Sequence, residues 1–156
     1  LKWPNDLIVN ERKLGGILSE LVIVRNQIRG VILGVGINQN VNEDDFPAEL
    51  RKSTTSIQME LGHPTSIELL IAAIINNVDE RLGNVSREDT YESIIREFRE
   101  LCITIGRDIL VQETNHSWHG TAVGIGIDGS LEVRDEYDRI RRVRAGEIVH
   151  ILHEES

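Results

Sequence analysis

The chain has 156 residues, of which 40% are hydrophobic and 28% are charged, and its formal net charge at neutral pH is −9. This length and hydrophobic content suit one globular domain, or one domain with a small second one. The negative charge argues against binding nucleic acid through a basic face. No apolar run approaches the roughly 18 residues of a membrane span, and no signal peptide is visible. We therefore expect neither nucleic acid nor a membrane as a partner.

The first six residues, Leu1 to Asp6, combine a lysine, a tryptophan and a proline with two short polar side chains. The proline fixes its own φ and pushes Trp3 toward extended geometry. Asn5 and Asp6 are typical turn residues. The pattern predicts a strand end, a rigid turn and a second strand, with Lys2 held at the turn. A lysine held in this way suits a carboxylate or phosphate, and the alternative is a solvated surface lysine.

Two apolar segments, residues 13–24 and 28–38, predict strands joined by a polar hairpin turn at residues 25–27. The second is almost continuously apolar, which is typical of a strand in the middle of a sheet and covered on both faces. Both contain glycines, which weaken strands. A bound ligand that approaches the backbone would explain these glycines, and a bulge or tight packing is the alternative. The segment Gly34-Val35-Gly36 lacks the third glycine and the helix of a dinucleotide-binding loop, so we reject that interpretation.

A loop follows, with an acidic run at residues 43–45 that is interpreted as a solvated edge rather than a metal site. Three helices are predicted after it. The first covers residues 57–61 and ends at Gly62. The second opens with a capping box at Thr65-Ser66 and ends at Gly83, and the third begins near Ser86. Their apolar residues recur at core spacing. The two longer stripes consist of Ile67, Leu70, Ile71, Ile74, Ile75, Val78 and Leu82, and of Tyr91, Ile94, Ile95, Phe98 and Leu101.

From Gly106 on, the hydrophobic period changes from helical to alternating. Short strands are predicted at residues 108–113, 118–127, 130–134, 140–143 and 147–152. Five short strands within about 50 residues indicate a small closed or nearly closed barrel. The change of period predicts a boundary between domains at residues 1–104 and 105–156. The fold class is α+β.

The single cysteine, Cys102, follows an apolar helical stripe and is predicted to lie in the core. It cannot form a disulfide within the chain, which favours a reducing, cytoplasmic location.

A metal site is considered at four histidines, His116, His119, His150 and His153. We reject it, because structural metal sites usually need four ligands and a second cysteine is missing.

Three motifs occur in order: Lys2-Trp3-Pro4-Asn5-Asp6, Lys13-Leu14-Gly15-Gly16-Ile17-Leu18 and Gly34-Val35-Gly36-Ile37-Asn38. With these spacings the chain resembles the biotin protein ligase family, also called biotin–[acetyl-CoA-carboxylase] ligase. The likeness continues through Ile105-Gly106-Arg107, residues 124–129 and residues 145–148. It implies the C-terminal part of a class II synthetase-like mixed or antiparallel sheet with packed helices, followed by an SH3-like barrel. Lipoate–protein ligases share the catalytic fold, but the first two motifs point to biotin.

Ligases similar to this sequence convert biotin and Mg-ATP into biotinyl-5′-AMP, and then transfer biotin to a lysine of a biotin carboxyl carrier protein. The resemblance therefore implies biotin, ATP and Mg²⁺ as ligands and the carrier protein as a partner. The first step brings together two anions, the biotin carboxylate and the α-phosphate, so a fixed cation is needed.

The resemblance assigns roles to particular residues. Lys2 matches the motif lysine, which implies a catalytic role in binding biotin and stabilising the transition state, without action as a base. Biotin binding is implied for Lys2, Gly15 and Gly16, and nucleotide binding for Asn5, Gly36 and Asn38. Asn5 and Asp6 are also expected to fix the turn that carries the lysine.

The chain departs from the family pattern upstream of its first motif. The Gly-Arg-Gly-Arg loop that covers biotin and the adenylate in the family does not occur in these 156 residues, and neither do the Ser/Thr-Asn-Gln segment and the first part of the sheet. Because the chain also opens on a leucine inside a motif, we expect it to be a fragment with little or no ligase activity alone. Some relatives carry an N-terminal winged-helix repressor domain.

Two hypotheses follow. The chain is the C-terminal half of a biotin ligase, or it is a non-catalytic remnant that binds a partner or assembles through exposed sheet edges. In both cases the missing strands would leave backbone groups unpaired, so we expect a homodimer or a separate N-terminal half to cover them.

Overall fold

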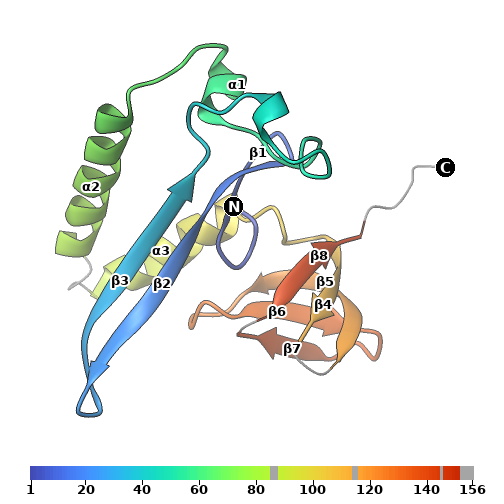
Figure 1. The fold of residues 1–156 in the computed structure, drawn as a ribbon. Coiled ribbons are helices and arrows are strands. Elements are labelled where there is room, and N and C mark those ends of the chain that lie inside the picture. The colour runs from blue at the N-terminus through green and yellow to red at the C-terminus, as the bar shows by residue number, and fades with distance from the viewer. Residues whose placement is uncertain (85–87, 114–115, 145, 152–156) are drawn as a thin grey trace. The chain divides into compact units, whose positions relative to one another are not determined.

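The computed structural model describes residues 1–84, 88–113, 116–144 and 146–151 (Figure 1). His153, one of the four histidines considered above, lies outside these ranges. The chain folds into two compact units. The meander unit is Asn5–Glu80, and the five-stranded unit joins Leu1–Pro4 to the residues from Arg81 on. Together they give the predicted α+β class.

The meander unit contains a three-stranded antiparallel sheet in the order β1-β2-β3. Its elements are β1 (Asp6–Val9), β2 (Arg12–Val24), β3 (Gln27–Ile37), a 3₁₀ turn (Glu43–Asp45), α1 (Ile57–Leu61) and most of α2 (Ile67–Asn84). Two-residue turns, Asn10-Glu11 and Arg25-Asn26, connect the strands, and all four residues have positive φ. Such turns match the twist of antiparallel strands. The predicted hairpin is confirmed, although Gln27 already belongs to β3.

The prediction that residues 28–38 form a central strand covered on both faces is wrong for the described structure. β3 lies at the edge of its sheet, where only β2 pairs with it among the described residues. Its side chains Val31, Ile32 and Leu33 are all exposed. The apolar run therefore produces a strand, but not a buried one.

The first predicted helix ends at its predicted cap, Gly62. In α1, Ser56 accepts a hydrogen bond from the backbone N–H of Met59 at 3.1 Å, and Gly62 ends the helix with φ of 77°. α2 runs one residue past the predicted stop at Gly83, and α3 (Glu88–Leu101) begins just after a segment outside the described residues. Their stripes are less buried than expected. Exposed members include Ile67, Ile71, Ile75, Leu82, Tyr91 and Leu101. Among the described helices, none is long and apolar enough to cross a membrane.

The five-stranded unit confirms the five strands predicted in the tail. They are β4 (Asp108–Gln112), β5 (Ser117–Ile125), β6 (Leu131–Asp135), β7 (Ile140–Val143) and β8 (Glu147–His150). They pair antiparallel in the order β7-β6-β5-β4-β8. Alternate residues face a common core, which includes Ile109, Val111, Leu131, Val133, Val143 and Ile148. Cys102 is buried in this core, as predicted.

The compact units do not divide at the predicted boundary between residues 104 and 105. Trp3, Cys102 and Thr104 are all buried within the five-stranded unit, so the segments before residue 105 contribute to its core. Whether residues 105–156 form a domain of their own stays a prediction.

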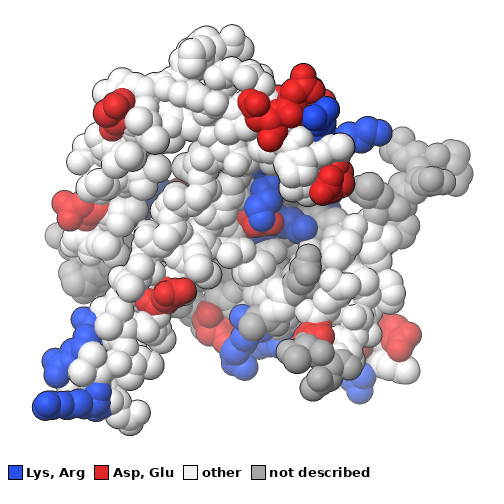
Figure 2. Space-filling view, in the orientation of Figure 1, with Lys and Arg blue, Asp and Glu red and all other residues white. Residues whose placement is uncertain are grey.

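Acidic and basic side chains are interspersed on the face of the molecule shown in Figure 2, without a large basic patch.

Candidate functional site

The predicted ligand-binding residues of the meander unit lie together at one end of its sheet. Gly16 pairs directly with Gly36, and Asp6 pairs with Gly16 on its other side. Asn38 follows β3 immediately. The structure thus gathers Asn5, Gly15, Gly16, Gly36 and Asn38 from three separate stretches of the chain.

Neighbouring glycines in this group serve different purposes. A Cβ on Gly15 would lie 2.1 Å from the carbonyl oxygen of Gly36, so close strand packing requires a glycine there. A Cβ on Gly16 would meet nothing nearer than 3.5 Å, and one on Gly36 nothing nearer than 3.8 Å. Tight packing, the alternative to a ligand, therefore accounts for Gly15. Packing does not require glycine at Gly16 or Gly36.

Gly16, Gly34 and Gly36 share one face of the sheet. Directly paired residues of antiparallel strands point to the same side, as Gly16 and Gly36 do, and residues two apart on a strand share a face. Gly34 and Gly36 are also exposed. We call these three residues the glycine strip. Without side chains, it leaves backbone that a bound molecule can approach closely.

Asn38 ties the end of β3 to the loop that follows. Its side-chain Nδ2 donates to the carbonyl of Thr55 at 3.0 Å, its backbone N–H donates to Leu14 at 2.9 Å, and its carbonyl accepts from Ile57 at 2.9 Å. These bonds give Asn38 a structural role that sequence analysis did not identify. Its predicted contact with a nucleotide stays a prediction.

The same loop is fixed by a polar cluster around Glu60. The Glu60 carboxylate accepts hydrogen bonds from Thr55 at 2.6 Å, Arg12 at 2.8 Å and Asn10 at 2.8 Å. The Thr55 hydroxyl has the largest effect, and with Asn10 and Arg12 it holds the pKa of Glu60 below its ordinary value, against desolvation. This cluster could not be predicted from the sequence, because its members are separated along the chain and match no motif.

Asn5 and Asp6 bond the first motif to the second, and their predicted role in fixing the turn that carries Lys2 stays a prediction. The carbonyl of Asn5 accepts the backbone N–H of Ile17 at 2.9 Å. The carboxylate of Asp6 forms an ion pair with Lys13 Nζ at 2.6 Å. Residues of the first two motifs are therefore bonded to each other, and Lys13 is the partner of Asp6.

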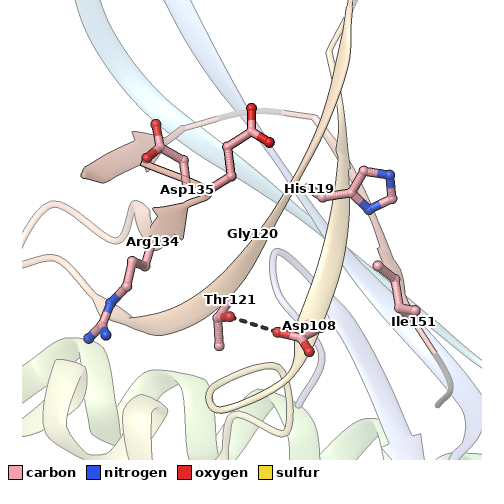
Figure 3. A pocket seen from close by; sticks show the side chains of 8 residues that line it. Asp108, His119, Gly120, Thr121, Arg134, Asp135 and Ile151 are labelled. Atoms are coloured by element: carbon pink, nitrogen blue, oxygen red, sulfur yellow. Dashed lines mark hydrogen bonds between the residues drawn. The ribbon is translucent and has the colours of Figure 1, made fainter. Parts of the chain in front are cut away.

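A pocket of about 300 Å³ lies on the five-stranded unit (Figure 3). Its lining residues are Asp108, His119, Gly120, Thr121, Arg134, Asp135, Glu136 and Ile151, and none of them was predicted to bind a ligand. Burial acts to raise the pKa of Asp135, but hydrogen bonds from Arg139 and from backbone N–H groups outweigh it and hold that pKa below its ordinary value. The carboxylate is thus already committed to Arg139.

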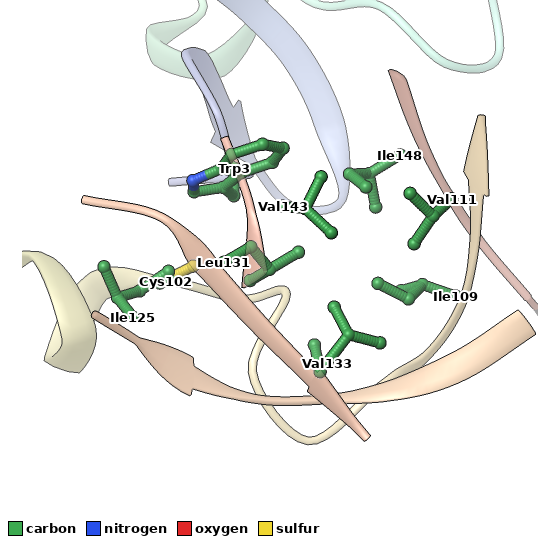
Figure 4. Packing of buried hydrophobic residues seen from close by; sticks show 10 residues of the cluster. Trp3, Cys102, Ile109, Val111, Ile125, Leu131, Val133, Val143 and Ile148 are labelled. Atoms are coloured by element: carbon green, nitrogen blue, oxygen red, sulfur yellow. The ribbon is translucent and has the colours of Figure 1, made fainter. Parts of the chain in front are cut away.

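Lys2, the predicted catalytic residue, belongs to the five-stranded unit and is half-buried. Its neighbour Trp3 is 3% exposed and points into the hydrophobic core (Figure 4). The Trp3 indole Nε1 donates to the carbonyl of Gly129 at 3.0 Å. The side chain of Trp3 is therefore held in one direction.

Similarity to known proteins covers nearly the whole chain. The sequence model of the biotin/lipoate A/B protein ligase family matches residues 1–38. The bifunctional ligase/repressor BirA of Bacillus spizizenii is 29% identical over 148 residues, which cover 95% of this chain and 45% of that protein. The biotin–[acetyl-CoA-carboxylase] ligase of Mycobacterium tuberculosis is 29% identical over 153 residues, which cover 97% of this chain and 53% of that protein. The chain thus spans about half the length of these curated relatives.

Solved structures show the same fold. The apo biotin protein ligase of Aquifex aeolicus superimposes with a TM-score of 0.80 at 22% identity, covering 97% of this chain and 64% of that one. The complex of the Aquifex aeolicus enzyme with biotin and ATP gives a TM-score of 0.78 at 21% identity, and the match covers 97% of this chain and 61% of that one. The three ordered motifs, the family model over residues 1–38 and the curated relatives all show that this chain is similar to biotin protein ligases.

Proposed function

We propose that this chain carries part of the active site of a biotin protein ligase. A carboxylate oxygen of biotin attacks the α-phosphorus of ATP, the bond to the β-phosphate breaks, and pyrophosphate leaves. The amine of a carrier-protein lysine then attacks the carbonyl of the biotinyl-adenylate and releases AMP. The observation that carries the proposal is the glycine strip, where Gly16 and Gly36 from two family motifs are direct neighbours and an added Cβ on either would meet only ordinary van der Waals contacts.

Lys2 supplies the fixed positive charge in this proposal. Both reactants of the first step are anions, and a lysine ammonium near the reacting carboxylate and α-phosphate offsets their repulsion most strongly in the transition state. Gly36 and Asn38 face the nucleotide, and Gly16 faces biotin. Gly15 contributes by allowing β2 and β3 to pack closely.

The Mg²⁺ of the reaction belongs to the substrate nucleotide. Within the described ranges, no three His, Cys, Asp or Glu side chains are grouped in a way that could hold a metal ion. Magnesium in phosphate-transfer sites is commonly bound through substrate phosphates and one or two carboxylates, which fits this assignment.

The acceptor in this proposal is a biotin carboxyl carrier protein. The lone, buried Cys102 supports a reducing cytoplasm.

A non-catalytic assembly module is the second candidate. One edge of β3 pairs with no described strand, and its side chains Val31, Ile32 and Leu33 are exposed. Both features favour this candidate, because such an edge can pair with another strand. In that case, residues 1–156 form a dimer or bind a separate N-terminal half. Light scattering at micromolar concentration tests this: a dimer supports assembly, and a strictly monomeric species contradicts self-assembly.

Biotin-dependent ATP–pyrophosphate exchange tests the ligase proposal. We expect activity from the longest native polypeptide that contains the chain, and little or none from residues 1–156 alone. Lys2→Ala should lower kcat by about 100-fold or more, whereas Lys52→Ala, at an exposed lysine outside the motifs, should not. Equal activity of the two variants would contradict the role of Lys2. Full exchange by residues 1–156 would contradict the expected need for further segments.

A further inference from the structure

The tryptophan of the first motif is a core residue of the five-stranded unit. It packs with the side chains of Leu131, Val143 and Ile148, which come from three strands far away in the sequence (Figure 4). Motif residues are expected near a ligand, yet Trp3 is 3% exposed and has no surface to offer one. Its function must therefore concern the position of its neighbours.

Hydrogen bonds hold the backbone on both sides of Lys2. Before it, the carbonyl of Leu1 accepts the N–H of Ile103 at 2.8 Å. After it, the backbone N–H of Trp3 donates to Thr104 Oγ1 at 3.1 Å, and the indole donates to the carbonyl of Gly129 at 3.0 Å. The segment that carries the lysine is thus bonded to two distant parts of the five-stranded unit.

The acceptors of these bonds are themselves fixed. Thr104 is completely buried, and its hydroxyl also lies 3.2 Å from His150 Nε2. A hydroxyl can accept one bond and donate another, so both contacts can be satisfied together. Gly129 lies in a tight turn, where Asp128 accepts hydrogen bonds from Ser130 and pairs with Arg144 at 3.0 Å.

We propose that Thr104 and the Asp128–Ser130 turn are positioning residues for Lys2. They act through Trp3, which they hold by its backbone N–H and its indole N–H. The inference rests on the proposed function of Lys2. A lysine side chain is long and flexible, so its ammonium is placed well only if its backbone is fixed. Misplacement of a reacting group by about 1 Å can lower a rate by about 100-fold.

Single substitutions separate the hydroxyl of Thr104 from its bulk. Thr104→Val keeps the shape and removes the acceptor of the Trp3 N–H, whereas Thr104→Ser keeps the acceptor. Thr121→Val is the matched control, because the Thr121 hydroxyl in the same unit donates its hydrogen bond to Asp108 at 2.6 Å. In the longest native polypeptide, we expect Thr104→Val to lower kcat of the exchange reaction about tenfold with the KM for biotin nearly unchanged. Thr104→Ser should recover most of that loss.

A double-mutant cycle with Lys2→Ala distinguishes positioning from general stability. If Thr104 acts through Lys2, Thr104→Val should lower kcat less than about twofold when Lys2 is already alanine. The same tenfold loss in both backgrounds would overturn the proposal, since Thr104 would then act independently of the lysine.

Hydrogen exchange of the Trp3 amide gives a second readout that needs no enzymatic activity. We expect Thr104→Val to speed this exchange at least tenfold, and Thr121→Val to leave it unchanged. An unchanged hydrogen-exchange rate of the Trp3 amide in Thr104→Val would overturn the proposal. This test also applies if the activity of Lys2→Ala is too low to measure the double-mutant cycle. If the unmutated polypeptide showed no biotin-dependent ATP–pyrophosphate exchange, the proposed function would fail. The hydrogen-exchange rate of the Trp3 amide would still decide whether Thr104 holds this segment.

Discussion

Gly15 and Gly36 approach so closely that a methyl group on Gly15 would overlap the carbonyl oxygen of Gly36, at 2.1 Å. Gly15 is buried and Gly36 is exposed. The adjacent Gly16 has room for a methyl group, with 3.5 Å to its nearest neighbours. The glycine pair of the second motif therefore combines one residue required for packing with one that leaves a face of the sheet open.

Alanine substitutions at the two positions should differ in their effect on stability. Gly15→Ala should lower the free energy of unfolding by about 1–3 kcal/mol or more, because backbone cannot move aside easily. Gly16→Ala should stay within about 1 kcal/mol of the unmodified protein. Urea unfolding of both variants provides the comparison. Equal losses would show that the close contact at Gly15 is relieved without cost.

A bulky residue on the glycine strip should impair ligand binding without unfolding the protein. Gly36→Val places a side chain on the exposed face beside Gly16, and we expect the affinity for biotin and ATP to fall at least about tenfold. Gly30→Val is the control, since Gly30 lies farther along β3 with nothing within 4 Å of its added Cβ. Calorimetric titration of both variants tests the strip. Unchanged affinity in Gly36→Val would remove it from the site.

Asn38 should matter for stability as well as for any ligand. Asn38→Ala removes the hydrogen bond to the Thr55 carbonyl and should cost about 1 kcal/mol. Asn38→Asp should cost more, because a carboxylate would face that carbonyl without a donor. Chemical denaturation of the two variants measures these costs. If both match the unmodified protein, the bond to Thr55 contributes nothing and Asn38 is free to serve a ligand alone.

Asp128 should make stability depend on pH in the acid range. Hydrogen bonds from the Ser130 side chain and backbone, together with Arg144, lower the pKa of Asp128 from 3.8 to about 2. A carboxyl with a depressed pKa in the folded state stabilises the fold above its unfolded pKa, and this contribution is lost as pH falls toward about 2.

The stability difference between the unmodified protein and Asp128→Asn should therefore shrink as pH falls from 5 toward 2.5. Unfolding curves at intervals across this range provide the measurement. Asp138→Asn, at a side chain that is 85% exposed, serves as the control. A difference that stays constant with pH would contradict the assigned pKa.

Local signals predicted much of the fold. The hairpin at Arg25-Asn26, the cap at Gly62 and the five strands of the tail each depend on a few neighbouring residues. Contacts between distant segments could not be predicted in this way. Trp3 meets the carbonyl of Gly129 across 126 positions, and the exposure of β3 depends on which segments lie beside it.

The candidate site shows the same limit. The motifs identified its residues, and the pairing of Gly16 with Gly36 brings two of those motifs together. The packing role of Gly15, the bond from Asn38 to Thr55 and the ion pair of Asp6 with Lys13 appear only when the strands are aligned. Each depends on register, which a single sequence does not specify.

The most direct test of the central claim is to measure which carboxylic acid, biotin or lipoate, supports ATP–pyrophosphate exchange. The assay uses the longest native polypeptide that contains the chain, with biotin, with lipoate and without added acid. We predict exchange with biotin and only background rates in the other two reactions. Exchange with lipoate but not with biotin, or none with either acid, would contradict the proposal that this chain is part of a biotin-activating enzyme.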